Sequence, residues 1–435
     1  MPTRPDPACG SGAALIRPRG DRQIAYYFPP IKAVGTLRNT RFAQSAQLYW
    51  SKVYVLTTSH TQVFDVEMGV PTDATILRVP SYDFRWLIWF LRRKKATHFS
   101  PQLKQQPGIS WIRRAVDSFP LNIILGDGGF FYLLIGYWHA AALIKKGEIS
   151  HLYSSFRPMS DHFLAYLLVR RFPFLIWTAD FRDPAVDPLS QNVWWPAFQH
   201  WVMRKLLGRA QHLTTVSEGL ATYLRTHYQR PVKVILNAPM RQQGLEVQAQ
   251  KFEQFTIVYT GSLYPQQQSA APLFQAIKNL LEDGLLKESE LKLLVCGKDG
   301  ALWQSWAMEF GLTNMLEDRG MLNHTESLSL QHGAHVNLLL SWNSPGLQGI
   351  LSAKVFEYLQ AKRPILAIVN GSTDAELENL IHTYSPGSLL VYAGQPIQLL
   401  ASFLQQEYQN WQQGKKNYLS LPDAPSWENE IKKVF

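Results

Sequence analysis

Residues 349–369 read GILSAKVFEYLQAKRPILAIV, a loop of small residues that runs into an amphipathic helical segment. Gly346 and Gly349 let the backbone approach a ligand closely, and the N–H groups at the start of the helix attract an anion. Lys354 places a positive charge in the first turn, where the helix dipole disfavours it unless an anion offsets it. Glu357 follows on the same helical face. These residue types suit a nucleoside diphosphate, with a lysine for the phosphates and a carboxylate for the ribose. The alternative is an ordinary surface pair.

On both sides of this stretch, short apolar runs alternate with helical segments. One helix is expected around residues 271–284 and another over 37–49, after a loop that contains Gly35. Strand alternating with helix implies mostly parallel sheets with right-handed crossovers. The expected strands are residues 23–30, 52–58, 122–128, 150–155, 175–181, 211–217 and 232–238 in the first half, and 255–261, 291–297 and 336–341 in the second.

This order of elements fits an α/β chain of two successive doubly wound, Rossmann-like domains. Residues 241–254 are polar and rich in glutamine, and we interpret them as the interdomain linker. Ligands in such sheets bind at the carboxyl ends of the strands, so the cleft between the domains is the predicted site. The expected parts are a flexible start at residues 1–20, an amino-terminal domain at 21–240, the linker, a carboxy-terminal domain at 255–412, and a tail or helix at 413–435 that packs back on the first domain.

Composition bounds the class of protein. The 435 residues are 46% hydrophobic and 17% charged, which is typical of a globular chain and excludes intrinsic disorder. Cys9 and Cys296 cannot build a disulfide framework or a thiolate metal site, and so indicate a reducing compartment. The apolar run AALI near the amino terminus is too short for a secretion signal. The longest uncharged run, residues 128–144, falls short of the about 20 residues that span a membrane, and it predicts a buried helix.

Several catalytic signatures are missing from the sequence. There is no G-x-S-x-G elbow, no Walker loop and no G-x-G-x-x-G after the first strand. Serine-hydrolase chemistry, ATP hydrolysis and dinucleotide redox chemistry therefore have little support. No cluster of carboxylates or histidines has metal-ligand spacing, so we expect no metal and no cofactor.

The net charge of +10 is unevenly distributed. Residues 1–240 carry 29 basic and 14 acidic side chains, a net charge of +15, whereas residues 241–435 carry 14 and 19, a net charge of −5. A basic first half favours an anionic partner, which could be a membrane surface, a phosphate-bearing substrate or nucleic acid. Because the basic residues form no recognisable module for reading nucleic acid, we expect no nucleic-acid partner.

Residues 84–95, FRWLIWFLRRKK, mix aromatic and aliphatic residues with a basic cluster. An interfacial membrane helix needs this combination, since each basic residue contributes about 1 kcal/mol at an anionic surface. The alternative is a core helix with a solvated basic end. The charge of the surrounding half favours contact with an anionic membrane.

The stretch at 349–369 resembles the nucleotide-sugar signature of glycosyltransferase family 4, whose members have the two-domain GT-B fold. The resemblance continues at FTIVYTGSLY (255–264), at VSEGLATYLRTHY (216–228), and at YYFPPIKAVGTLR (26–38). It also includes SSFRPMSDH and TADFRDP in the first half. Matches in this order cover nearly the whole chain, which makes the set far more specific than any single piece.

The resemblance implies roles for individual residues. Glu357 would hold the donor ribose, and Lys354 with the loop at 346–350 would contact the diphosphate and the sugar. Gly261 and Ser262 would close on the phosphates, and the turn at 320–322 would flank the base. The donor-binding residues implied in this way are Gly35, Gly261, Ser262, Gly320, Met321, Leu322, Gly346, Gly349, Ile350, Lys354 and Glu357.

The sequence also departs from the family pattern. Many members have a second glutamate eight residues before the one at 357, which touches the transferred sugar, and here that position is Gly349. The basic residues common after the Gly-Ser turn are absent, because LYPQQQSAA follows Ser262. A sugar contact is therefore lost or moved, and Lys354, with Lys298 in CGKDG as a further candidate, must supply the positive charge for the phosphates.

Two strand ends in the first half carry polar groups that we expect at the cleft. TADFRDP places Asp180, Arg182 and Asp183 after an apolar strand, and SSFRPMSDH supplies Arg157 and His162 at another. We predict catalytic roles for Asp180 and Arg182 beside Lys354, and acceptor or cleft roles for the other three. The alternatives are a local Arg and Asp network that holds a loop, and a core histidine at 162.

The resemblance implies a retaining, metal-independent hexosyltransferase that takes a sugar from a nucleoside diphosphate donor, with UDP favoured. Its acceptor would be lipid-linked or a growing glycan, as in bacterial envelope or exopolysaccharide synthesis. A cytoplasmic location follows, peripheral on the inner face of the membrane. Two alternatives stay open: a nucleotide-sugar epimerase of the same fold, and a catalytically silent binding partner.

Overall fold

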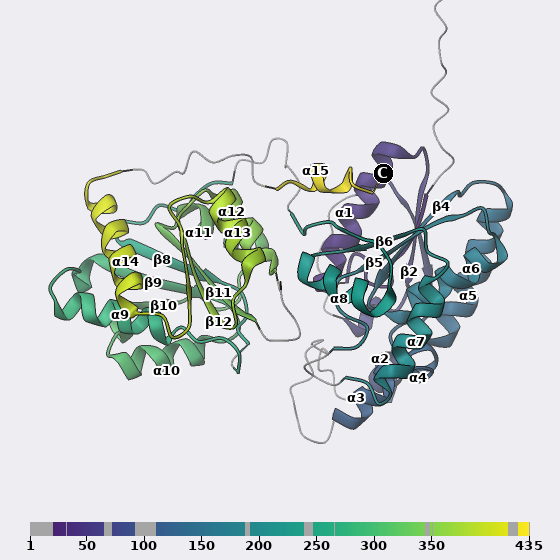
Figure 1. Ribbon diagram of the computed structural model, residues 1–435, viewed down its shortest axis with the longest axis horizontal. Helices are drawn as coiled ribbons and strands as arrows, with labels where there is room; N and C mark the ends of the chain where they lie inside the picture. The colour runs from purple at the N-terminus through teal and green to yellow at the C-terminus, as the bar shows by residue number, and fades with distance from the viewer. Residues whose placement is uncertain are drawn as a thin grey trace, which may run out of the picture. The chain divides into compact units, whose positions relative to one another are not determined.

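Two parallel β-sheets organise the chain, and Figure 1 shows them with their helices. The structure is a computed structural model that describes residues 21–31, 33–64, 72–91, 110–187, 192–238, 247–264, 266–343, 349, 351–415 and 425–434. Its strands are β1 (Asp21–Ile24), β2 (Val53–Thr58), β3 (Thr75–Val79), β4 (His151–Phe156), β5 (Ile176–Phe181), β6 (His212–Thr215), β7 (Val232–Val234), β8 (Phe255–Thr260), β9 (Leu291–Cys296), β10 (Leu316–Asp318), β11 (Val336–Asn343), β12 (Ile365–Gly371) and β13 (Leu389–Tyr392). Its helices are α1 (Val34–Tyr49), α2 (Phe84–Leu91), α3 (Ser110–Asp117), α4 (Leu121–Ile124), α5 (Gly129–Lys145), α6 (Met159–Arg171), α7 (Pro196–Leu207), α8 (Glu218–Tyr228), α9 (Ala271–Glu282), α10 (Gly300–Phe310), α11 (His324–Gly333), α12 (Ala353–Ala361), α13 (Ala375–Tyr384), α14 (Ile397–Gln412) and α15 (Trp427–Ile431).

The strand order follows the same rule in both sheets. It is β3-β2-β1-β4-β5-β6-β7 in the first sheet and β10-β9-β8-β11-β12-β13 in the second. Neighbours such as β1 and β2, β8 and β9, and β11 and β12 run parallel. The order reverses between β1 and β4 and between β8 and β11, and such switch points leave a crevice at the carboxyl ends of the strands. The prediction of two doubly wound sheets is therefore confirmed.

Contacts group the residues into two compact units. Strands β1 to β4 belong to one unit together with α1, α2, α5 and α6. The second sheet, all of its helices, and α7 and α8 belong to the other. This grouping does not test the predicted linker at residues 241–254, which stays a prediction.

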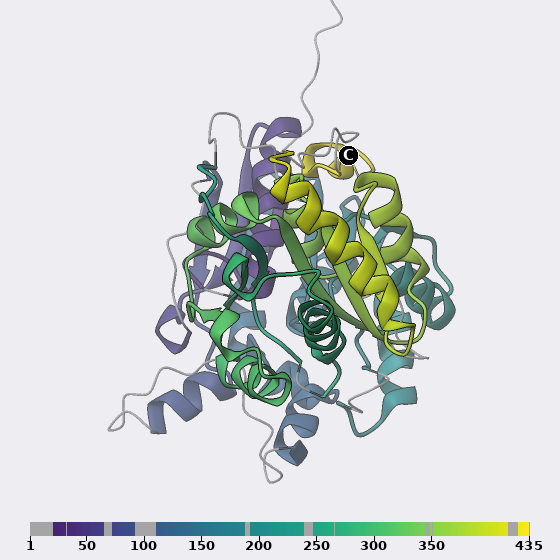
Figure 2. The same cartoon turned by 90° about the vertical axis from the view of Figure 1, so that its left-hand side faces the viewer.

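The second sheet is the middle layer of a three-layer unit. Every residue of β8 is buried, as expected for a strand that is covered on both faces. On one face α9, α10 and α14 pack with side chains that include Phe274 and Trp303. On the other, α12 and α13 pack with Phe356 and Leu377. Figure 2 shows α14 in yellow, crossing in front of the strands. This double cover fixes the strand ends that carry the candidate site.

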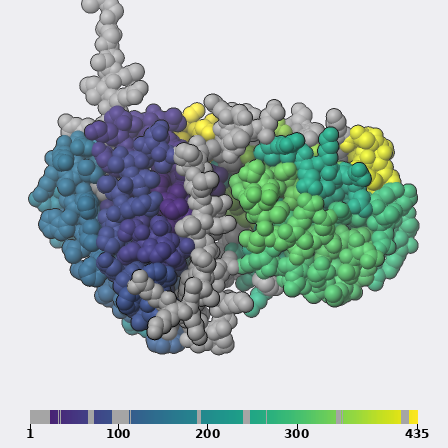
Figure 3. Space-filling model, turned by 180° about the vertical axis from the view of Figure 1, so that it is seen from behind, coloured from purple at the N-terminus to yellow at the C-terminus, as the bar shows by residue number. Residues whose placement is uncertain are grey.

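Helix α5 covers part of the first sheet, but it is not the buried helix that the sequence predicts. Its inner face packs tightly, since Gly136 lies against Leu164 of α6 and Leu56 of β2. Its outer face leaves four large apolar side chains exposed: Phe130, Phe131, Leu134 and Trp138. In Figure 3 the unit that contains α5 is coloured from purple at its first strand to blue around α5, and its atoms adjoin one another on the face shown. No helix among the described residues is both long and apolar enough to cross a membrane.

Two predictions of local structure are wrong, and one strand was not predicted. Residues 122–128 are not a strand, because α4 and a turn occupy them; two buried residues, Asn122 and Ile123, are followed by the exposed Ile124, which is not the alternation of a strand. Gly35 lies within the first turn of α1 rather than in a loop. The sequence analysis also missed β3, an edge strand with mostly exposed or half-exposed side chains that give little hydrophobic signal.

The carboxy-terminal helix α15 is tied to the end of the first sheet. The backbone N–H of Leu236 donates to Glu430 Oε2 at 2.9 Å, and Lys233 Nζ donates to the carbonyl oxygen of Lys433 at 2.8 Å. Trp427 is fully buried. These contacts hold the end of the chain beside β7.

Candidate functional site

Lys354 lies against the end of β8, at the switch point of the second sheet. Its Nζ donates to Tyr259 Oη at 2.8 Å and to the carbonyl oxygen of Ser262 at 3.3 Å, and it lies 4.3 Å from the centroid of the Tyr259 ring. Gly261 makes this approach possible, because a Cβ at that position would lie 2.5 Å from Lys354 Cε. The φ of Gly261 is +108°, which also favours glycine. The structure therefore brings together the predicted Lys354, Gly261 and Ser262.

Within the part of the chain that the structure describes, no ion pair joins the ammonium of Lys354 to a carboxylate. Burial lowers the pKa of Lys354 to about 8, although the charges of Glu357 and Asp299 oppose this shift. Its two hydrogen-bond acceptors are a hydroxyl and a carbonyl oxygen, which carry no full negative charge. An anion at the end of β8 would supply the missing countercharge.

Glu357 is positioned by a residue that the sequence analysis did not single out. Gln331, fully buried on α11, donates from Nε2 to Glu357 Oε2 and to Thr260 Oγ1, both at 2.9 Å. His324 Nδ1 lies 4.0 Å from the other carboxylate oxygen, Oε1. Thr260 is the last residue of β8, so Gln331 couples the carboxylate to the same strand end that holds Lys354.

Sequence reasoning did not single out Tyr259 within the stretch FTIVYTGSLY, and it missed Gln331, which belongs to no recognisable motif. Tyr259 reads as one more apolar residue of a buried strand, and Gln331 as one polar residue of a surface helix. Only the register of α11 and α12 against β8 turns them toward the lysine and the carboxylate.

The structure describes only some of the other residues that are predicted to bind the donor. The backbone N–H of Gly297, which follows β9, donates to the carbonyl oxygen of Gly320 at 2.8 Å, so the turn at 320–322 lies at the carboxyl edge of the sheet. Met321 is exposed, whereas Leu322 packs against the core. Gly346 and Ile350 lie outside the described residues. Gly35 lies in α1 of the other unit.

A polar hollow of about 690 Å³ lies at the opposite ends of the strands. Its lining includes Leu291 and Leu316, the first residues of β9 and β10. Ligands of doubly wound sheets bind at the carboxyl ends instead, so we place the candidate site at Lys354 and Glu357. Among the residues that the structure describes, no group of three His, Cys, Asp or Glu side chains could hold a metal ion.

The structure places the predicted residues of the first sheet at two depths. Arg157 directly follows β4, and Arg182 and Asp183 directly follow β5, as predicted for groups at the carboxyl edge. Asp180 lies inside β5, fully buried, where Thr214 Oγ1 donates to its Oδ1 at 2.7 Å. His162 is also fully buried, with Nδ1 2.8 Å from Ser154 Oγ, which matches the alternative of a core histidine.

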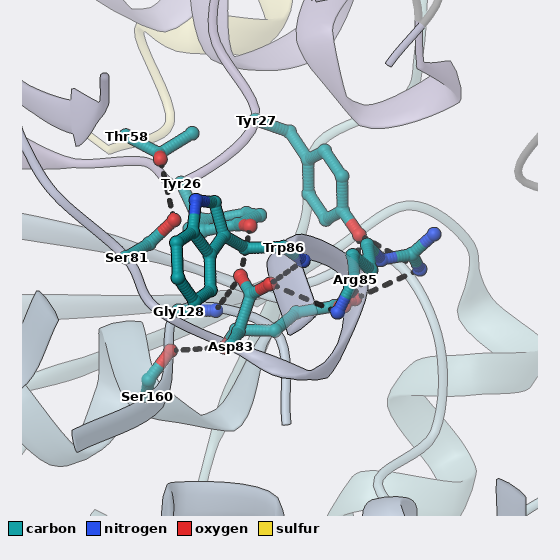
Figure 4. A network of polar contacts seen from close by, with 10 residues as sticks. Tyr26, Tyr27, Thr58, Ser81, Asp83, Arg85, Trp86, Gly128 and Ser160 are labelled. Carbon is teal, nitrogen blue, oxygen red and sulfur yellow. Dashed lines mark hydrogen bonds and ion pairs between the residues drawn. The ribbon is translucent and has the colours of Figure 1, made fainter. Parts of the chain in front are cut away.

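A second polar cluster lies near the switch point of the first sheet (Figure 4). Asp83 caps α2, because its Oδ1 accepts from the backbone N–H groups of Arg85 and Trp86, both at 3.1 Å. Its Oδ2 accepts from Tyr26 Oη and, at 3.2 Å, from the backbone N–H of Gly128. One carboxylate thus joins the residues after β1, the start of α2 and the turn before α5.

Asp127 stands beside this carboxylate with a cationic partner of its own. Arg85 Nε donates to Asp127 Oδ1 at 2.6 Å, and Tyr27 Oη donates to Oδ2 at 2.5 Å. Although burial opposes it, Arg85 lowers the pKa of Asp127. Burial and the neighbouring charge of Asp127 raise the pKa of Asp83 to about 6. Asp127 is therefore the stronger acid of the two, and Asp83 the weaker.

Replacing Asp83 with alanine should destabilise the amino-terminal unit by about 2–4 kcal/mol, because α2 loses its cap and buried donors lose their acceptor. Urea denaturation followed by circular dichroism measures the loss. Asp73→Ala, at an exposed position of the same unit, is the matched control. A loss equal to that of the control would show that the cluster does not support the fold.

Replacing Lys354 with methionine should raise the stability of the folded protein at pH 7 by about 1–2 kcal/mol, because a partly buried charge is removed. The folded lysine releases its proton near pH 8, below its ordinary value of 10.5, so wild-type stability rises between these values. The advantage of Lys354→Met should therefore shrink as the pH rises from 8 to 10 in urea denaturation. Lys251→Met, at an exposed position, is the control. An advantage independent of pH would contradict this account.

No protein-family model and no curated protein matches the sequence of this chain. Solved structures do match it. A sucrose-phosphate synthase from Thermosynechococcus elongatus is 13% identical with a TM-score of 0.54, over 96% of this chain and 95% of its own. Anabaena HepE, solved in complex with UDP and glucose, is 10% identical with a TM-score of 0.54, over 96% of this chain and 98% of its own.

A UDP-N-acetylglucosamine 2-epimerase also matches, at 10% identity and a TM-score of 0.50, over 96% of this chain and 95% of its own. The similarity to all three structures extends over both sheets, and it lies in the fold. The chain has the GT-B fold, as the resemblance at residues 349–369 predicted.

Proposed function

We propose that the protein is a glycosyltransferase that moves a sugar from a nucleoside diphosphate donor, UDP being favoured, to a lipid-linked or glycan acceptor with retention at the anomeric carbon. The observation that carries this proposal is the convergence of Lys354 and Glu357 with Gly261 and Ser262 at the switch point of the second sheet. The cation of Lys354 and the carboxylate of Glu357, three residues later on the same helix, match a diphosphate and a ribose.

The proposed reaction breaks the bond between the anomeric carbon and the diphosphate oxygen, and the oxygen of an acceptor hydroxyl forms the new bond while its proton passes to the departing diphosphate. Negative charge grows on the departing diphosphate, and Lys354 beside the turn at Gly261 would stabilise it. We also propose a catalytic role for Arg182 and an acceptor role for Arg157, which follow strands β5 and β4 of the first sheet. We expect no metal requirement.

A nucleotide-sugar epimerase is the second candidate, since an epimerase shares the fold over nearly the whole chain. The two reactions differ in their need for an acceptor. An epimerase converts UDP-N-acetylglucosamine into a second sugar nucleotide when it is incubated with that substrate alone. A transferase leaves the sugar unchanged until an acceptor is added.

Binding of nucleotides tests the proposal directly. UDP, GDP, dTDP, CMP and NAD are compared for their effect on the melting temperature, and one nucleoside diphosphate at 100 times its Kd should add about 2.7 kcal/mol of stability. Glu357→Ala should weaken its binding about tenfold, as expected when a charged hydrogen-bond acceptor of the ribose is lost. Glu309→Ala, on α10, is the control. Unchanged affinity of Glu357→Ala would remove this residue from the ribose site.

A membrane surface is the proposed location of the acceptor, on the cytoplasmic face. No residue of α2 is fully buried, which disagrees with the alternative of a core helix. Leu87, Phe90 and Leu91 are 46%, 46% and 74% exposed. Tyr82, just before α2, contacts Phe131 of α5 at a centroid distance of 5.5 Å, which joins α2 to the exposed face of α5. The basic residues 92–95 lie outside the described residues, directly after α2 in the sequence.

Replacing Leu87 and Leu91 with glutamine should reduce sedimentation of the protein with vesicles that contain anionic lipid, because both leucines would lose apolar contact with the bilayer. Replacing Arg92, Arg93, Lys94 and Lys95 with glutamine should have the same effect and weaken the dependence on salt. Leu399→Gln, an exposed leucine of α14, is the matched control. Sedimentation that both sets leave unchanged would exclude α2 from membrane contact.

A further inference from the structure

Gly349 is where the family pattern places a carboxylate, and in this structure another carboxylate occupies the adjoining space. A Cβ built on Gly349 would lie 2.4 Å from Oε2 of Glu376. The φ of Gly349 is +70°, a conformation that a glutamate adopts only with strain. A side chain at position 349 would therefore clash with Glu376 in its observed position.

Glu376 belongs to the same edge of the second sheet as Lys354. It lies in the first turn of α13, which follows the end of β12. The segment between them is fixed to the neighbouring strand, because Asn343 Nδ2, at the end of β11, donates to the carbonyl oxygen of Thr373 at 2.9 Å. Strands β11 and β12 pair in parallel up to Asn343 and Gly371. The carboxylate is thus placed by two strands and a helix start.

The order of charges along α12 gives a direction to a bound donor. A nucleoside diphosphate sugar is linear, with ribose, diphosphate and sugar in sequence. Glu357 in the middle of α12 and Lys354 in its first turn match the ribose and the diphosphate, and Gly349 precedes the helix. The sugar follows the diphosphate in the ligand, so in the direction from Glu357 to Lys354 it would lie next, at the loop that contains Gly349. The Glu376 carboxylate lies beside that loop.

The Glu376 carboxylate is held in place and still has acceptor capacity. Its Oε1 accepts from the backbone N–H of Glu218 at 2.7 Å, and its Oε2 accepts from that of Gly219 at 3.0 Å, both at the start of α8. An ionised carboxylate offers about four lone-pair sites, and these two bonds use one on each oxygen. The remaining sites suit hydroxyl donors of a sugar.

We propose that Glu376 replaces the missing carboxylate at position 349 and accepts hydrogen bonds from hydroxyl groups of the transferred sugar. This inference rests on the proposed function and adds a residue that recognises the sugar rather than the nucleotide. The carboxylate comes from α13 instead of the loop before α12.

The test separates recognition of the sugar from recognition of the nucleotide. Calorimetric titration gives the Kd of UDP, UDP-glucose, UDP-galactose and UDP-N-acetylglucosamine, and of GDP with GDP-mannose, for the wild type and for Glu376→Ala and Glu376→Gln. The Kd of the preferred sugar nucleotide should rise about tenfold in both variants, while that of the parent nucleoside diphosphate stays within about twofold. Glu376→Gln keeps the length of the side chain and guards against a folding defect. Glu378→Gln, on the same helix, is the matched control and should change neither Kd.

Three outcomes would overturn the inference. Variants of Glu376 that leave both Kd values unchanged would show that the carboxylate does not contact the sugar. An equal rise in both Kd values would mean that Glu376 only supports the local structure. If the wild type binds no nucleoside diphosphate at all, the proposed function fails and this inference fails with it.

Discussion

The contact between Lys354 and the end of β8 is the constraint on which the second sheet's site depends. A lysine in the first turn of a helix is opposed by the helix dipole, and burial adds to that cost. The protein nevertheless places the ammonium over the Tyr259 ring and beneath a turn that only a residue without a side chain can form. An arrangement that works against stability in the resting protein is typical of a group kept for a ligand.

The polar cluster around Asp83 and Asp127 in the first sheet differs from the Lys354 site, because it is built on carboxylates rather than on a cation. Two carboxylates lie close together there, and the fold stabilises them with its own groups: an arginine and a tyrosine at Asp127, and backbone amides and a second tyrosine at Asp83. Hydrogen-bond donors of the fold therefore stabilise both carboxylates, whereas the acceptors of Lys354 carry no full charge. Its position fixes the start of α2, whose exposed apolar side chains are the part available to a partner.

The sequence predicted the two sheets, because periodic strands carry local signals, and the stretch at 349–369 nominated Lys354 and Glu357, which the structure places at the end of β8. It did not predict what depends on tertiary placement. Asp180 reads as a cleft residue at the end of an apolar run, but β5 continues past it and buries it. Gln331 carries no motif, and it becomes important only because α11 packs beside Glu357 and Thr260. The outer face of α5 is as apolar as its inner face, so composition alone predicts burial that packing does not supply.

The spacing of charges in the second sheet favours an extended ligand over a simple anion. A lone phosphate would be satisfied by Lys354 and the turn at Gly261, and it would gain nothing from a carboxylate nearby. Here one carboxylate, Glu357, lies in α12 three residues after the lysine, and a second, Glu376 of α13, lies beside Gly349 in the loop before α12. Carboxylates repel phosphate but accept hydroxyl groups well, so each favours a polyol rather than an anion. A ligand with hydroxyl-rich ends and an anionic centre satisfies all three groups at once, and a nucleoside diphosphate sugar has that form.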